Sequence, residues 1–271
     1  MIRLPRTGVL PALAWLAVMS TACGVSLQKL PSGPGTVATD AATALSQAVS
    51  VCQTVQSLSA EMRVSGNAGG QRLRGRVLVG LAAPASALLD AAAPFGASLF
   101  IYAARDGAAT LLLPRDRRLL EHGDPAGVLA AVTGVPLGPD DLRLALTGCV
   151  GSIGPMTGRA YGDAWRAVTL QNADVFLRRA EAGRWRVAAV VHTAADAGWR
   201  ADYSEFAADL PRAVRLSSAD GHRFDLRLTL AQVEVNPALP PETFAIRAPA
   251  GFEPITLDEL RRNGPMADPA P

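Results

Sequence analysis

The sequence lacks the motifs that mark the commonest enzyme sites. It contains no Walker loop, no GxSxG, no HExxH and no CxxC pair, which argues against those nucleotide-binding, hydrolase and zinc-binding classes. His122, His192 and His222 lie in separate segments and have no partner at the spacing of metal ligands. Asp140 and Asp141 pair two carboxylates, but they precede a predicted helix, which favours capping over acid and base chemistry. We therefore predict no catalytic residue, no metal site and no cofactor.

The chain is also short of aromatic residues and of net charge. Aromatic side chains make up 5% of its 271 residues, so alanine, valine and leucine must build the core. Removal of the leader described below takes Arg3 and Arg6 from 26 basic residues and leaves 24 basic and 24 acidic residues. A neutral chain without a basic stripe is a poor binder of nucleic acid, so we expect no nucleic-acid partner.

Long hydrophobic runs are missing as well. The apolar segment from Val9 to Met19 is about eleven residues long, short of the ~20 that a helix needs to span a bilayer. It follows two arginines and ends in small residues, which is typical of an export signal. Residues 1–22 are thus predicted to be a signal peptide.

The end of this leader, "LAVMSTACG", resembles the bacterial lipobox, in which a signal peptide is cut directly before a lipidated cysteine. The resemblance implies cleavage between Ala22 and Cys23 and a lipid anchor on Cys23; the alternative is an ordinary secretory leader. In lipoproteins an aspartate after the cysteine commonly signals inner-membrane retention. Gly24 stands there instead, which favours an outer membrane, facing the periplasm, in a Gram-negative cell.

The rest of the chain divides by composition into three parts. Residues 23–39 have the proline, glycine and serine content of a flexible, lipidated tether. Residues 40–250 carry periodic apolar patterns and form the predicted domain. Residues 251–271 are predicted to form one short helix and a disordered tail.

Helical periodicity occurs at two places in the domain. Leu45, Val49 and Cys52 belong to an apolar stripe that predicts a helix over residues 41–56, with Asp40 as its N-cap. Two shorter helices are predicted between residues 124 and 147, since each segment begins with capping residues and ends near a glycine.

Strand alternation fills most of the remaining domain. In "RLRGRVLVGL" one parity is occupied by Leu73, Val77, Val79 and Leu81 and the other by the three arginines, so the arginines are expected to face water. In the last long strand the alternation changes parity near Ala231, which predicts a bulge. The element order predicts an α+β fold in which a curved antiparallel sheet of about 10–11 strands, an incomplete barrel, wraps around helices.

Two cysteines remain after lipidation of Cys23. Cys52 and Cys149 form an even pair in a compartment that permits oxidation, which favours a disulfide. The alternative is two buried, inert thiols.

The segment "APFGASL" places Phe95 between Pro94 and Gly96 in a predicted turn. A large apolar side chain at the tip of a turn either folds back into the core or has something to touch. We therefore treat Phe95 as a candidate functional residue, with a core phenylalanine as the alternative.

Three segments together carry a family resemblance: "PFG", "VTGVPLGPDDLRLALTG" and "DLPRAVRLSSADGHRFDLRLTLAQVEV". In order and spacing they resemble the LolB branch of the LolA/LolB lipoprotein-localisation superfamily, and the chain is similar to uncharacterised lipoproteins that share its fold. The resemblance implies an incomplete antiparallel barrel whose concave face, covered by helices, holds acyl chains, without catalysis or cofactor. It also implies that Phe95 lies on a loop that places cargo in the membrane.

An acyl-binding cavity on that face is predicted from inward-facing strand residues. They are Met62, Val64, Val77, Val79, Leu99, Ile101, Leu226 and Leu228. The expected partners are acyl chains of lipids or lipoproteins, the membrane through Cys23, and a periplasmic carrier protein. The same residues would equally line a filled core, and the competing function is a structural or regulatory lipoprotein that binds a protein partner.

Overall fold

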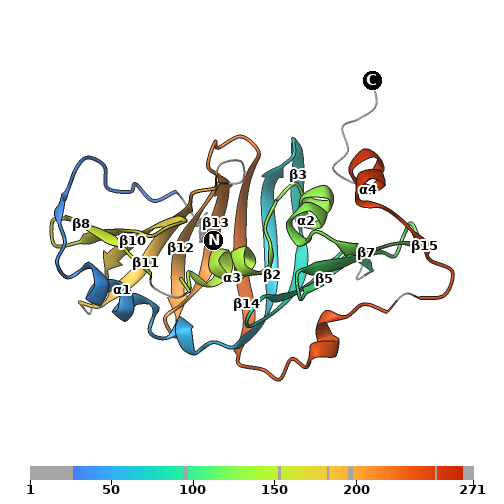
Figure 1. The fold of residues 1–271 in the computed structure, drawn as a ribbon, viewed down its shortest axis with the longest axis horizontal. Coiled ribbons are helices and arrows are strands. Elements are labelled where there is room, and N and C mark those ends of the chain that lie inside the picture. The colour runs from blue at the N-terminus through green and yellow to red at the C-terminus, as the bar shows by residue number, and fades with distance from the viewer. Residues whose placement is uncertain are drawn as a thin grey trace, which may run out of the picture.

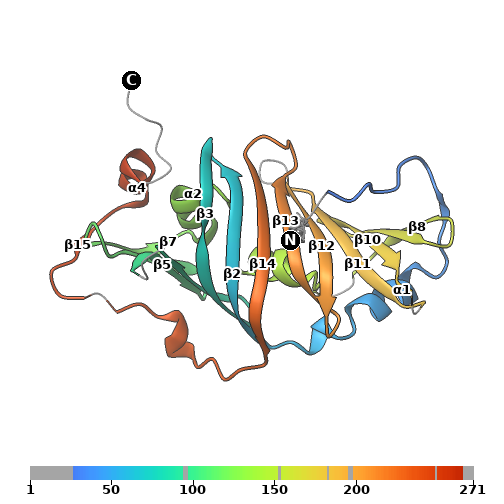
Figure 2. The same cartoon turned by 180° about the vertical axis from the view of Figure 1, so that it is seen from behind.

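A single open sheet forms the body of the molecule (Figures 1 and 2). The computed structural model describes residues 27–93, 97–151, 154–181, 183–194, 198–247 and 249–264. Within these ranges 15 strands pair in the order β1-β8-β9-β10-β11-β12-β13-β14-β2-β3-β4-β5-β6-β7-β15. All neighbours are antiparallel except β15 and β7, which are parallel.

The strands differ greatly in length. Those of the first half are β1 (Thr36–Val37), β2 (Ser57–Ala68), β3 (Gln71–Ala82), β4 (Ser86–Ala92), β5 (Ser98–Arg105), β6 (Ala108–Leu113) and β7 (Arg118–Gly123). Those of the second half are β8 (Thr157–Tyr161), β9 (Trp165–Thr169), β10 (Ala173–Arg179), β11 (Trp185–His192), β12 (Trp199–Ala207), β13 (Leu210–Ser218), β14 (Phe224–Val235) and β15 (Glu253–Pro254). The α+β class and the open antiparallel sheet are confirmed. The 15 strands exceed the 10–11 predicted, and the two-residue strands β1 and β15 at the two edges account for two of the additional ones.

Three helices cover one face of this sheet, which we call the inner face; the opposite one is the outer face. They are α1 (Ala41–Val49), α2 (Pro125–Thr133) and α3 (Pro139–Thr147). Figure 1 shows α2 and α3 in front of the strands, and in Figure 2 the same strands lie in front of the helices. The fourth described helix, α4 (Leu257–Asn263), contacts α2.

The predicted helix pair α2 and α3 is confirmed, with its caps. The Asp124 carboxylate accepts a hydrogen bond from the Gly127 N–H at 2.6 Å and begins α2. Gly134 and Gly148 end the two helices in the left-handed conformation, with φ of 76° and 67°. The short connection between them keeps both helices on the inner face.

Helix α1 is shorter than predicted. It ends at Val49, and a separate 3-10 turn follows at Cys52–Thr54. Asp40 does not cap it: both carboxylate oxygens accept hydrogen bonds from Arg166, at 2.8 and 2.9 Å. That hydrogen-bonded guanidinium lowers the pKa of Asp40 below its usual value. An ion pair with β9 therefore holds the start of α1 on the sheet.

The centre of the sheet consists of its longest strands, β14, β2 and β3, with 12 residues each. The bulge predicted near Ala231 is present, because the register with β2 shifts between Ala231 and Glu234 and Gln232 takes a positive φ of 50°. The arginines of β3 are exposed, as predicted. Alternation along these strands sends most apolar side chains to the inner face and polar ones to the outer face, with exposed Leu78 of β3 as an exception.

The segment predicted to be a free tether is partly held by the sheet. Thr36 and Val37 form β1 and pair with β8. Gln28, eight residues before Thr36, binds β11 and β12. Its side-chain amide donates to the carbonyl oxygens of Ala188 and Tyr203 at 3.1 and 2.8 Å. Proline and glycine content did not reveal these contacts, because they involve only Gln28 and the two residues of β1.

The chain's C-terminal part wraps around the other edge of the sheet. The 3-10 turn η2 (Pro241–Phe244) contacts β4 and β5, and Phe244 is buried. The backbone then adds β15 beside β7, and Leu260 of α4 is fully buried against the core. This segment runs from β14 to the α2 helix and so supports that helix from outside (Figure 1).

Candidate functional site: an apolar cavity beneath two helices

A cavity of about 500 Å³ lies between the inner face and the helices α2 and α3. This volume falls in the range of ~300–1,000 Å³ that is usual for small-molecule pockets. Most of its lining is aliphatic. The lining residues are Met62, Val64, Gln71, Leu73, Arg74, Gly75, Arg76, Val77, Leu89, Ala91, Ala92, Leu99, Phe100, Leu113, Arg115, Asp116, Leu129, Val132, Thr133, Val135, Leu137, Leu142, Ala145, Leu146, Leu216, Leu226 and Leu228.

Polar lining residues gather at one end of the cavity. Gln71 and Arg74 stand beside the β2–β3 turn, and Arg115 and Asp116 form the β6–β7 turn, which lies at the same end of the sheet. Arg74, Arg115 and Asp116 are exposed, so the cavity opens to water there. Thr133, on the helix side, donates its hydroxyl to the Leu129 carbonyl at 2.7 Å and leaves the interior apolar.

Six of the eight predicted cavity residues line this space: Met62, Val64, Val77, Leu99, Leu226 and Leu228. The other two do not. Val79 has the predicted parity but is buried in the core beyond the cavity. Ile101 lies in register with Asp90 and Leu112, and its neighbours Phe100 and Tyr102 face inward instead.

The error at Ile101 has a local cause. Strand β5 reads Ser-Leu-Phe-Ile-Tyr, so both parities are apolar and alternation cannot decide which one faces in. In addition, the register with β4 shifts between Ala91 and Ala92, which places Leu99 opposite no residue of β4. Leu99 consequently reaches the cavity from the bulge, 40% exposed, while Phe100 follows it on the inner face.

The helical wall of the cavity could not be assigned from strand patterns. Leu142, Ala145 and Leu146 project from α3, and Leu129 and Val132 project from α2. Their spacing of three and four residues marks one helical face. That periodicity was the available signal, and it would have identified the wall once the helices were placed over the sheet.

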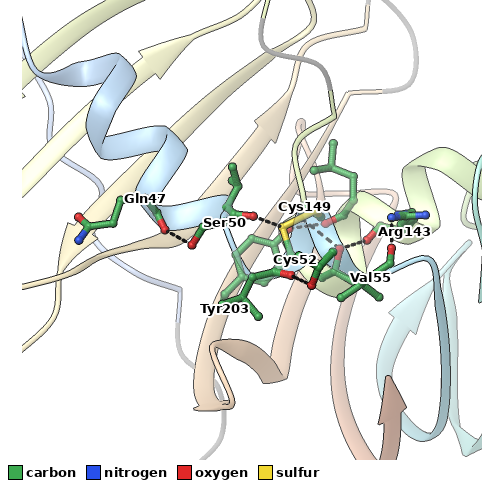
Figure 3. Close-up of a disulfide and its surroundings, with 12 residues drawn as sticks. Gln47, Ser50, Cys52, Val55, Arg143, Cys149 and Tyr203 are labelled. Atoms are coloured by element: carbon green, nitrogen blue, oxygen red, sulfur yellow. Dashed lines mark hydrogen bonds between the residues drawn. A yellow bond between two sulfur atoms is a disulfide. The ribbon is translucent and has the colours of Figure 1, made fainter. Parts of the chain in front are cut away.

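A disulfide and two hydrogen bonds hold α3 in place (Figure 3). Cys52 and Cys149 are joined, as predicted, with 5.5 Å between their Cα atoms. The Arg143 guanidinium donates to the Val55 carbonyl oxygen, and the buried Tyr203 hydroxyl donates to the Leu144 carbonyl at 2.8 Å. Burial raises the pKa of Tyr203 above its usual value, so it stays a donor. The cavity's helical wall is therefore anchored on the side of α1 and β12.

The loop that contains Pro94, Phe95 and Gly96 lies outside the described residues. Its flanks are described: the Ala93 N–H donates to the Ala97 carbonyl at 2.8 Å and closes the β4–β5 hairpin. Ala92 and Leu99, immediately beside the loop, both line the cavity. The hairpin thus begins and ends at the cavity opening. Cys23 also lies outside the described residues.

The remaining polar candidates do not form a second site. His192 stacks on Trp199 with 5.3 Å between ring centroids, and its Nε2 lies 3.9 Å from Asp141. Asp141 also accepts a hydrogen bond from the Gly138 N–H, a capping contact. Across the residues that the structure describes, no group of three or more metal-ligating side chains occurs. Nor does any helix there have the length and apolarity to span a membrane.

Comparison with known proteins defines the fold class. No protein-family profile and no curated protein matches the sequence. A LolA superfamily protein from Nitrosomonas europaea matches in structure with a TM-score of 0.50 at 10% identity, over 76% of this chain and 97% of that chain. The lipoprotein LppX from Mycobacterium tuberculosis gives 0.31 at 10% identity, over 73% and 96%, and LprF from Mycobacterium bovis gives 0.34 at 12% identity, over 78% and 100%. The chain has a LolA-like fold.

Proposed function

We propose that this protein is a lipid-anchored envelope protein that binds acyl chains of lipoproteins or lipids in the cavity and delivers them to the outer membrane. The observation that carries the proposal is the apolar cavity of about 500 Å³, open at one end and enclosed by the sheet and two helices. Its LolA-like fold and its resemblance to the LolB branch support the same role. The proposal includes the lipid on Cys23.

The energetics of such a site suit transfer. Each methylene removed from water contributes about 0.8 kcal/mol, so ten buried methylenes contribute about 8 kcal/mol. A membrane interior offers an acyl chain nearly the same apolar surroundings, and exchange between cavity and membrane therefore needs no energy source. The polar rim of Gln71, Arg74, Arg115 and Asp116 can remain in water beside a lipid headgroup while the acyl chain of that lipid lies inside the cavity.

The direct test is native mass spectrometry of the chain from Gly24, which contains every described element, purified gently after expression in bacteria. We expect co-purifying species with the masses of fatty acids, phospholipids or acylated peptides, at about one per protein. Protein that repeatedly purifies without any bound acyl species, and that takes up no fatty acid when one is added, would contradict acyl binding. That result would favour a structural or regulatory role with a protein partner.

We further propose that Phe95, with Pro94 and Gly96, forms the contact through which cargo passes to the membrane. Phe95→Glu should leave acyl affinity unchanged and slow transfer of a bound fluorescent acyl chain to acceptor vesicles at least tenfold, because a carboxylate resists entry into the acyl region. Val235→Glu, at an exposed apolar residue near the end of β14, is the matched control. Equal transfer rates for the two variants would remove Phe95 from the site.

A further inference from the structure

The outer face of the three central strands carries a cluster of arginines. Arg63 on β2, Arg72, Arg74 and Arg76 on β3, and Arg227 on β14 are all exposed, and we call them the arginine patch. Cross-strand register makes them contiguous: Arg76 lies opposite Arg63, and Ser65 separates Arg74 from Arg227. A chain that is neutral overall thus gathers positive charge on one surface.

Few carboxylates compensate this charge. Arg76 lies 3.9 Å from Glu61, and Asp225 is engaged by Arg215, at 2.7 and 2.9 Å. Hydrogen bonding to Arg215 lowers the pKa of Asp225, with the nearby Arg227 adding to the effect. In the described part of the chain, the other four arginines of the patch form no ion pair. Like charges on adjacent strands repel, so this arrangement is costly without an anionic partner.

The chain's N-terminal segment reaches this same face. Asp202 is fully buried on the outer face of β12, where it accepts a hydrogen bond from the Gln28 N–H at 3.1 Å and two from Arg200 at 2.5 and 2.8 Å. Arg200 in turn donates to the Gln28 carbonyl at 2.6 Å. Gln28 is therefore bound where β11 and β12 separate, since their ladder ends at Ala189 and Asp202.

Register places Gln28's site and the patch in one row. Asp202 lies opposite Arg215, Arg215 opposite Arg227, and beyond Ser65 the row ends at Arg74. At about 4.8 Å per strand, Arg227 is two strands or roughly 10 Å from Asp202. Cys23 precedes Gln28 by five residues, which span at most about 17 Å. A lipid on Cys23 would thus enter the membrane close to the patch.

We propose that the arginine patch seats the outer face on a membrane surface of anionic phospholipids. The membrane is favoured over a protein partner because Ser65, Asn67 and Thr229 separate the arginines, and the exposed apolar side chain of Leu78 lies at the edge of the patch beyond Arg76, not at its centre where a hot spot would be expected. Guanidinium groups bind phosphates by charge-assisted hydrogen bonds without needing a shaped pocket. Arg72 and Arg74 stand at the cavity end of β3, so this seating also brings the opening to the bilayer.

The position of the membrane close to the patch rests on the lipid anchor of the proposed function, whereas the positive charge of the patch does not depend on it. The test therefore uses the chain from Gly24, which has no anchor, and sedimentation with vesicles of phosphatidylglycerol and phosphatidylcholine. We expect binding to the mixed vesicles, little binding to pure phosphatidylcholine, and loss of binding as salt rises to about 1 M, where the Debye length is ~3 Å.

The triple variant Arg63→Gln, Arg72→Gln, Arg227→Gln, which leaves the cavity rim intact, should weaken vesicle binding about 100-fold, at about fivefold for each arginine. The matching lysine variants should bind like the wild type. Arg178→Gln, Arg261→Gln, Arg262→Gln removes the same charge elsewhere, from β10 and α4, and should have little effect. Acyl uptake is measured on every variant as well. Wild-type protein that binds acyl chains but does not bind anionic vesicles would contradict the membrane seating and leave the proposed acyl binding intact.

Two results would overturn the membrane assignment. One is wild-type protein that fails to bind phosphatidylglycerol vesicles at low salt, which would favour an acidic protein as the partner of the patch. The other is equal loss of binding in the patch variant and in the control variant, which would show that net charge alone, not this surface, governs the interaction.

Discussion

Replacing Ala91 with tryptophan is expected to lower the affinity for an acyl chain at least tenfold and leave the fold intact. Ala91 lies on the inner face of β4, in register with Val77 and Phe100, and all three line the cavity. An indole at this position enters empty space, so it does not overpack a filled core, which would cost 1–3 kcal/mol. It competes directly with a ligand for that space. Displacement of a fluorescent fatty acid measures the effect.

The control for this variant adds the same ring where no cavity exists. Leu78→Trp is suitable because Leu78 is 55% exposed, on the outer face of β3, adjacent in sequence to the cavity residue Val77. Both variants should unfold cooperatively near the wild-type temperature. Wild-type affinity in Ala91→Trp would mean that acyl chains bind elsewhere on the protein, and the cavity would then have no role in the proposed function.

Apart from the Cys52–Cys149 disulfide, which followed from the even number of cysteines, the features that sequence could predict are encoded within a few neighbouring residues. Helices α2 and α3 were located because Asp124 and Gly134 mark a start and a stop in the chain itself. Alternation along β14 placed Leu226 and Leu228 correctly, since Arg227 between them is polar. Local signals of this kind survive folding because tertiary contacts agree with them.

Apart from the orientation of Ile101, on a strand that is apolar on both parities, the features that sequence missed depend on contacts between distant segments. Asp40 is a good N-cap residue, yet Arg166, far along the chain, forms two hydrogen bonds with its carboxylate. Gln28 lies in a tether-like stretch, yet its amide satisfies two carbonyl oxygens where β11 and β12 part. The arginine patch is likewise formed by β14, β2 and β3 together. No single strand sequence shows that these charges meet on one surface.

Replacing both Cys52 and Cys149 with alanine is expected to reduce the free energy of unfolding by about 4–5 kcal/mol. The disulfide closes a loop with a sequence separation of 97, and loop-closure entropy gives this value for about 100 residues. For a domain of this size the melting temperature should fall by roughly 10 °C. Urea denaturation of the wild type, oxidised and reduced, beside the double variant provides the measurement.

Comparison of the reduced wild type with the double variant separates the cross-link from the packing of the side chains. Cys52 is buried, so its replacement alone also removes contacts, whereas reduction breaks the bond and keeps the sulfur atoms. We expect most of the loss in both samples. The bond joins the 3-10 turn that follows α1 to the residue after the C-cap of α3. Acyl affinity should therefore fall with it, as Leu142 and Leu146 lose their fixed place over the sheet. Unchanged stability on reduction would mean that the hydrogen bonds of Arg143 and Tyr203 suffice to hold the helix.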